Sequence, residues 1–94
     1  MIVSNPEDYT FIRFEKSMNK SKKYDAVLLN SKTGKVKRVA FGQLPYQQYK
    51  DKALGLYSSI NHLDTKRREN YRKRHSGEEK HKYSSGWFSW YYLW

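Results

Sequence analysis

The sequence contains no cysteine, only two prolines, and only 18 Leu, Ile, Val and Phe residues among its 94. The missing cysteines exclude a disulfide framework, thiolate metal ligands and a cysteine nucleophile. These four residue types make up just under one fifth of the chain, a fraction below which independent folding becomes doubtful. The net charge of +10 also disfavours a compact fold, because like charges repel. We therefore expect one small domain that gains stability by binding a partner.

Aromatic residues offset this shortage, because the chain carries 16 Phe, Trp and Tyr residues with large buriable areas. They concentrate at the end: seven of the eight residues from Trp87 to Trp94 are aromatic or leucine, and all three tryptophans lie there. That segment is less than half of the roughly 20 residues that span a bilayer as a helix. The first residues show no signal-peptide pattern. We therefore do not expect a membrane partner.

Positive charge is in excess along the whole chain. Lys and Arg number 19 against 9 Asp and Glu, and residues 1–63 carry +6 while residues 64–94 carry +4. Such a balance favours a polyanionic partner, which is either nucleic acid or an acidic protein surface. It gives no indication of a small-molecule substrate.

Local patterns predict an α+β fold, with a single basic domain at residues 9–94 and an N-terminal arm at residues 1–8. Pro6 discourages regular structure in the arm. Alternating side chains predict a strand in residues 9–15, with Phe11 and Arg13 on one face.

Two further β-like runs, residues 24–30 and 35–41, flank a short loop that ends in Gly34. This arrangement predicts a β-hairpin whose glycine takes the left-handed conformation. The hairpin either stands alone or joins the first strand in a three-stranded antiparallel sheet. Broken alternation at residues 36–39 predicts a bulge in the last strand.

Helical signals follow the sheet. Pro45 can open a short helical turn through Tyr49, after which the chain reads as an irregular connection. The stronger signal is a basic helix over residues 65–76, with Asp64 as its N-cap and Gly77 as its stop.

The predicted helix carries six Lys and Arg in nine residues and almost no apolar residue. It is either a solvated cationic helix held by Tyr71, or a helix that contacts phosphates or an acidic surface. The pattern does not separate DNA from acidic protein. The candidate polyanion-binding residues are Arg67, Arg68, Arg72, Lys73 and Arg74.

Two histidines and a carboxylate, His62, Asp64 and His75, are weak metal-ligand candidates. Structural roles explain them more simply, because Asp64 suits a helix cap and His75 suits the last helical turn. No His-Glu-x-x-His motif, catalytic carboxylate pair or Gly-rich phosphate loop accompanies them. We therefore expect no metal, no cofactor and no enzymatic activity.

The aromatic segment follows Ser84 and Ser85, either of which can cap a final helical turn, and an extended tail is the alternative. The segment either folds onto the chain's own sheet or fills pockets on a partner, and we favour the partner anchor. Interleaved aromatic and cationic residues also suit stacking on single-stranded bases. The predicted anchor residues are Trp87, Phe88, Trp90, Tyr91 and Trp94.

Several motifs occur in a characteristic order between residues 24 and 94. They are Phe41-Gly42, Tyr46-x-x-Tyr49, Asp51-Lys52, His62-x-Asp64-x-x-Arg67-Arg68-x-x-Tyr71-x-x-Arg74-His75 and Gly86-x-Phe88-Ser89-Trp90-x-x-Leu93-Trp94. This series resembles a small family of uncharacterised basic proteins encoded by large double-stranded DNA viruses. The resemblance implies a viral origin, and small basic proteins of such viruses are often virion components. The chain departs from the family at residues 48–50, where members often carry Asp-Tyr-Thr.

The expected function is a non-enzymatic viral structural protein, a minor capsid or cement-type component of the virion. It would bind acidic neighbours, capsid proteins in particular, and anchor through its aromatic C-terminus. We expect it in the virion, and otherwise inside the host cell. The alternative is a nucleic-acid-binding virion or host-interaction protein that uses the basic helix, residues 65–76.

Overall fold

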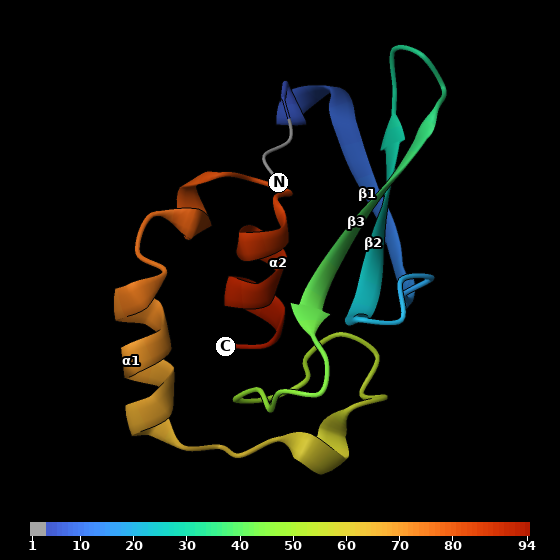
Figure 1. Cartoon of the computed structure of the whole chain (residues 1–94). Coiled ribbons are helices and arrows are strands. Elements are labelled where there is room, and N and C mark those ends of the chain that lie inside the picture. The colour runs from blue at the N-terminus through green and yellow to red at the C-terminus, as the bar shows by residue number, and fades with distance from the viewer. Residues whose placement is uncertain (1–3) are drawn as a thin grey trace.

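The structure is a computed structural model that describes residues 4–94. Three antiparallel strands form one sheet in the order β1-β2-β3, α2 lies against one face of it, and α1 lies on the side of α2 away from the sheet (Figure 1). The fold is thus the small α+β architecture expected from the sequence. The elements are β1 (Tyr9–Lys16), β2 (Lys22–Asn30), β3 (Val36–Gln43), α1 (Thr65–Arg74) and α2 (Ser85–Tyr92), with 3-10 turns at Pro6–Asp8, Ser58–Ile60 and Glu78–Lys80.

The predicted N-terminal arm, residues 1–8, is only partly within the described residues. From Ser4 onward the chain is more regular than expected, because Pro6–Asp8 forms a 3-10 turn that leads directly into β1. Within residues 4–94 no helix is long and apolar enough to cross a membrane.

The hairpin between β2 and β3 is confirmed. Gly34 has a φ of 74°, in the left-handed region that glycine adopts without a steric penalty, and its N–H donates to the carbonyl of Asn30 at 2.7 Å. The Asn30 side chain also accepts from the N–H groups of Lys32 and Thr33. The turn is therefore encoded locally, and β1 adds to the hairpin to give the three-stranded sheet.

The bulge lies in β1 and not in the last strand. Pairing between β2 and β3 is continuous, so the prediction of a bulge there is wrong. Between Phe11 and Arg13 the register with β2 shifts by one residue, which leaves Ile12 without a partner. The shift turns Phe14 rather than Arg13 toward α2, where its ring lies 4.7 Å from that of Tyr92. Phe14 thereby joins Tyr9 and Phe11 of β1 in packing against the core.

The core forms between the sheet and α2, and Phe88 of α2 is central to it. Its side chain is only 1% exposed, and its ring lies 5.4 Å from that of Phe41 and 5.9 Å from that of Phe14. The aromatic segment therefore supplies the protein's own interior, and the prediction that Phe88 fills a pocket on a partner is wrong. The buried hydrophobic residues are Tyr24, Ala26, Val27, Leu28, Val39, Phe41, Tyr83, Phe88 and Leu93.

The opposite face of the sheet is covered by charged side chains instead of a second layer. Val27 points to this face and is 1% exposed, and its partners in the neighbouring strands are Arg13 and Arg38. Both guanidinium groups pair with Glu15, at 2.6 and 2.7 Å. Such solvent-exposed pairs contribute little to stability, because water screens them. The long aliphatic stems account for more, because they shield Val27 from water.

The segment after β3 is not the helical turn predicted from Pro45 to Tyr49. Gln48 instead forms a parallel bridge with Asn61, and its fully buried side chain donates to Asn61 Oδ1 at 2.6 Å. Pro45 favours a helical start only where nothing competes, and here the tertiary hydrogen bonds of Gln48 draw the chain into an extended path. The rest of the connection is irregular, as expected, apart from the 3-10 turn at Ser58–Ile60.

This connection also completes the C-terminal end of α2. The backbone N–H groups of Lys50 and Lys52 donate to the carbonyls of Leu93 and Tyr92, at 3.1 and 2.8 Å. A helix leaves its last carbonyls without intrahelical partners, so these two bonds stabilise the helix end. The N-terminal end is capped by Ser84, whose hydroxyl accepts from Trp87 N–H at 3.1 Å.

We predict that Phe88→Ala destabilises the protein by about 3–4 kcal/mol, because it opens a cavity in the middle of the core. Tyr91→Ala is the matched control on the same helix, since Tyr91 is 45% exposed, and we expect it to cost less than about 1 kcal/mol. Urea unfolding followed by circular dichroism measures both. Equal losses for the two variants would contradict the placement of α2.

Candidate functional site

The basic helix begins as the sequence predicts. Asp64 Oδ1 accepts hydrogen bonds from the N–H groups of Lys66 and Arg67, at 2.9 and 3.2 Å, which confirms its role as the N-cap. The helix ends at Arg74, two residues before the predicted end, and His75 forms its C-cap. This short helix presents three faces with different roles.

The first face of α1 holds the helix on the rest of the protein. The ring of Tyr71 stacks on the indole of Trp94, with ring centroids 4.2 Å apart and planes 4° from parallel. His75 stacks on the same tyrosine at 4.2 Å. Because α1 contains no buried residue, this aromatic stack replaces the apolar stripe by which most helices dock.

Arg68 and Arg72 strengthen this docking. Arg68 Nε donates to the Trp94 carbonyl at 2.7 Å and its guanidinium lies 4.9 Å from the Tyr49 ring. Arg72 Nη2 donates to the same carbonyl at 3.3 Å, and its guanidinium lies 4.9 Å from the Trp90 ring. Both cations are thus engaged within the fold through hydrogen bonds and cation–π contacts. Arg68 and Arg72, which the sequence predicted to bind a polyanion, thus contact the chain's own C-terminal segment instead.

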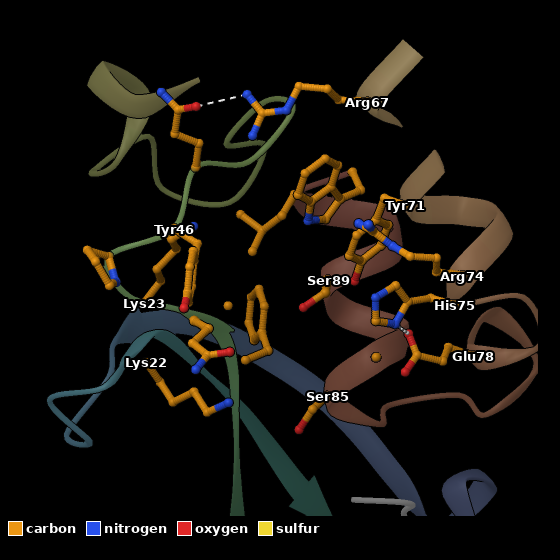
Figure 2. Close-up of a pocket in the computed structure, with 18 residues that line it drawn as sticks. Lys22, Lys23, Tyr46, Arg67, Tyr71, Arg74, His75, Glu78, Ser85 and Ser89 are labelled. Carbon is orange, nitrogen blue, oxygen red and sulfur yellow. Dashed lines mark hydrogen bonds and ion pairs between the residues drawn. The ribbon is translucent and has the colours of Figure 1, made fainter. Parts of the chain in front are cut away.

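The second face of α1 lines a cleft of about 770 Å³, bounded also by α2, the end of β3 and the loop that follows β3 (Figure 2). Arg67 and Arg74 contribute to this wall, so two of the five predicted binding residues meet here. Arg67 Nη1 also donates to Gln47 Oε1 at 2.9 Å, which joins the two sides of the opening. The charged residues that line the cleft are Lys22, Lys23, Arg67, Arg74 and Glu78.

The third face of α1 points to solvent. It carries Lys66, Glu69, Asn70 and Lys73, all exposed. Lys73 is thus the third predicted binding residue that stays available to a partner, but it does not share the cleft with Arg67 and Arg74. The five predicted cations therefore do not form one surface: two face Trp94, two line the cleft and one points to solvent.

Beneath the cleft lies a buried cation that sequence reasoning missed. Lys23 is 2% exposed, and its ammonium donates to Gln48 Oε1 at 2.6 Å. Burial lowers the pKa of Lys23 to about 8, and the nearby Asp51 carboxylate opposes part of that shift. Lys23 lies in a polar, cationic stretch with no periodicity, so no local signal marks it as buried.

Asp51 organises the loop on the other side of this cation. Its carboxylate accepts from the Tyr24 hydroxyl and from the N–H groups of Ala53 and Tyr57, at 2.9 and 3.0 Å. Burial raises the pKa of Tyr24, and the hydrogen bond to Asp51 raises it further. Asp51 and Gln48 thus tie the long connection to the sheet, which keeps the floor of the cleft in place.

The three weak metal candidates serve separate local roles. His62 Nδ1 accepts from Asp64 N–H at 2.9 Å, Asp64 caps α1, and His75 Nδ1 lies 3.0 Å from Glu78 Oε2 in the cleft. Burial lowers the pKa of His62, and the Arg67 charge lowers it further. In residues 4–94 no group of three His, Cys, Asp or Glu residues is arranged to hold a metal ion.

The remaining predicted anchor residues are only partly accessible. Trp87, Trp90 and Trp94 are half-buried against their own chain, while Tyr91 is 45% exposed. Trp90 and Trp94 are also engaged by the arginines of α1. A partner could therefore reach Tyr91 and the edges of these indoles, which is a smaller contact than the sequence led us to expect.

The chain matches no protein-family model, no curated protein sequence and no solved structure. The resemblance to a viral family thus stays a prediction.

We predict that the free energy of unfolding rises by about 2 kcal/mol between pH 8 and pH 10 because of Lys23. In this window the buried ammonium loses its proton, while an unfolded chain with the ordinary pKa of 10.5 retains it. The unfolded state then binds more protons, so stability rises with pH. Burial raises the pKa of Tyr71 to about 12. Above pH 10 the unfolded chain therefore loses the Tyr71 proton before the folded protein does, and this group lowers the free energy of unfolding as pH rises.

Urea unfolding at a series of pH values tests this with Lys23→Met, which should lose most of the rise, and with Lys22→Met as the control in the neighbouring position. If Lys23→Met kept the same pH dependence as the unmodified protein, the buried cation would not be its source.

We predict that Trp94→Ala releases α1, since the Tyr71 stack and the acceptor geometry for two arginines depend on Trp94. Amide hydrogen exchange within Thr65–Arg74 should accelerate at least about tenfold, while exchange in β2 should change much less. Lys73→Ala, which alters the solvent face of the same helix, should leave the exchange rates of α1 nearly unchanged. Unaltered protection of α1 in Trp94→Ala would contradict the docking described here.

Proposed function

We propose that the protein is a non-enzymatic structural component of a virus particle, of the minor capsid or cement type, that binds acidic neighbouring components. One observation carries the proposal: in residues 4–94, no Asp or Glu side chain forms an ion pair with a Lys or Arg of α1. Within this described part of the chain, none of the five predicted binding cations lies within 4.0 Å of an Asp or Glu side-chain carboxylate, although three other Lys and Arg residues do. Arg68 and Arg72 donate instead to the main-chain oxygen of Trp94.

The unpaired charge favours an external anion over a merely solvated helix. Lys66 and Lys73 point outward from α1, and Arg67 and Arg74 line the adjoining cleft. Like charges so close together destabilise the isolated protein, and an acidic neighbour removes that repulsion. The affinity gained on assembly also stabilises a domain with a small core, because binding to the folded state shifts the folding equilibrium.

The aromatic C-terminal segment offers a partner less surface than a free tail would. With Phe88 in the core and the tryptophans half-buried, the aromatic end contributes Tyr91 and indole edges rather than a free tail. The proposed contact is therefore chiefly electrostatic, and it should weaken as salt concentration rises. The virion assignment itself derives from the resemblance of the sequence to viral proteins.

Proteomics of purified particles of the encoding virus, fractionated into shell and genome-bearing core, tests the proposal. We expect the protein in the shell fraction at a constant ratio to the capsid proteins. A virus that carries Lys66→Gln and Lys73→Gln should incorporate less of it, while Lys20→Gln with Lys35→Gln, which removes equal charge from the two exposed loops that join the strands, should not. Absence of the protein from purified particles would rule the proposal out.

A further inference from the structure

The cleft beside α1 has features that an acidic protein neighbour does not require. Its lining carries four Lys and Arg residues against one carboxylate, Glu78, whose Oε2 lies 3.0 Å from His75 Nδ1. A concave site lined by one sign of charge focuses its potential and attracts anions. A volume of about 770 Å³ is in the range of sites that hold a ligand the size of a nucleotide.

The cations stand on two sides of this cleft. Lys22 belongs to β2, whereas Arg67 and Arg74 project from α1, seven residues apart. Figure 2 shows Lys22 on one side of the opening and the two arginines on the other. Arg74 makes no hydrogen bond or ion pair within the part of the chain that the structure describes. A phosphate that enters the cleft therefore meets donors on both sides, one of which has no competing partner.

An aromatic ring lines the cleft on the same side as Lys22 (Figure 2). Tyr46 follows Pro45 in the loop after β3, lines the cleft and is 64% exposed. Because this ring is mostly exposed, it contributes little to the core. It provides a flat surface on which a base can stack while the adjoining phosphates contact Lys or Arg.

We propose that this cleft binds a segment of single-stranded nucleic acid, with one base stacked on Tyr46 and its flanking phosphates held by Arg67, Arg74 and Lys22. A base paired in a duplex offers no free face to Tyr46, so single strands are preferred. An acidic peptide satisfies the cations but offers no base for the ring. The proposal adds a second ligand to the structural function above and does not depend on it.

Fluorescence anisotropy with a fluorescein-labelled oligodeoxythymidylate of about ten nucleotides tests the proposal, since single-stranded sites span roughly 4–16 nucleotides. The unmodified protein should bind it more tightly than a duplex of the same length, with an affinity that falls as salt rises. Tyr46→Ala should weaken binding about tenfold by removing one stacked base. Circular dichroism should show the variant folded, because the Tyr46 side chain is mostly exposed.

A matched pair of α1 variants separates the cleft from general electrostatics. Arg74→Gln removes a cleft cation and should weaken binding about tenfold and reduce the salt slope by about one, whereas Lys73→Gln removes an equal charge next to it and should weaken binding less than about threefold. Equal effects of the two variants, or equal affinity for single strand and duplex, would overturn the proposal.

An oligoglutamate peptide of the same length serves as competitor. If it displaces the oligonucleotide at equal concentration, the cleft is a site for acidic peptide and the nucleic-acid proposal fails. Neither outcome bears on whether the protein is found in virus particles, so the two proposals can fail independently.

Discussion

The fold depends on the burial of α2 between the sheet and α1. One side of this helix inserts Phe88 among the aromatic rings of the strands. Trp94, two residues beyond the end of the helix, stacks on Tyr71 of α1. A chain with so few aliphatic residues reaches a closed core only by using nearly all of its terminal aromatic segment. The segment Trp87–Trp94, which the sequence suggested as a partner anchor, thus packs largely against the protein's own interior.

This packing determines where the charge can act. With Arg68 and Arg72 turned toward Trp94, the basic helix cannot offer all its cations to one partner. Arg67 and Arg74 instead face the end of β3 across the cleft. The cleft has room to form because α2 lies between α1 and the sheet (Figure 1). The buried polar groups Lys23 and Gln48 keep the loop that carries Tyr46 at the opposite rim.

The features that could be read from the sequence are those set by neighbouring residues. The Gly34 turn, the Asp64 cap and the Ser84 cap each satisfy local hydrogen bonds. The sequence predicts the first two, and for the third it leaves Ser84, Ser85 and an extended tail open. The bulge at Ile12, the extended path after Pro45 and the burial of Lys23 depend on contacts between distant segments, and no local pattern reports them. The same limit applies to the site.

The cleft brings together residues of β2, the loop after β3 and α1, so composition predicted only an affinity for polyanions and half of the cationic residues involved. The direction in which Arg68 and Arg72 point could not be predicted, because it depends on Trp94, more than twenty residues away in the sequence.

The most direct test of the central claim is a nuclear Overhauser spectrum of the isolated protein in solution. The structure places the Phe88 ring 5.4 Å from the Phe41 ring and the Tyr71 ring 4.2 Å from the Trp94 indole. Cross-peaks between the ring protons of both pairs, at low protein concentration and without any partner, are the predicted result. Their absence, with Phe88 and Trp94 at random-coil chemical shifts, would show that the aromatic segment is free and that the core, α1 docking and cleft described here do not form.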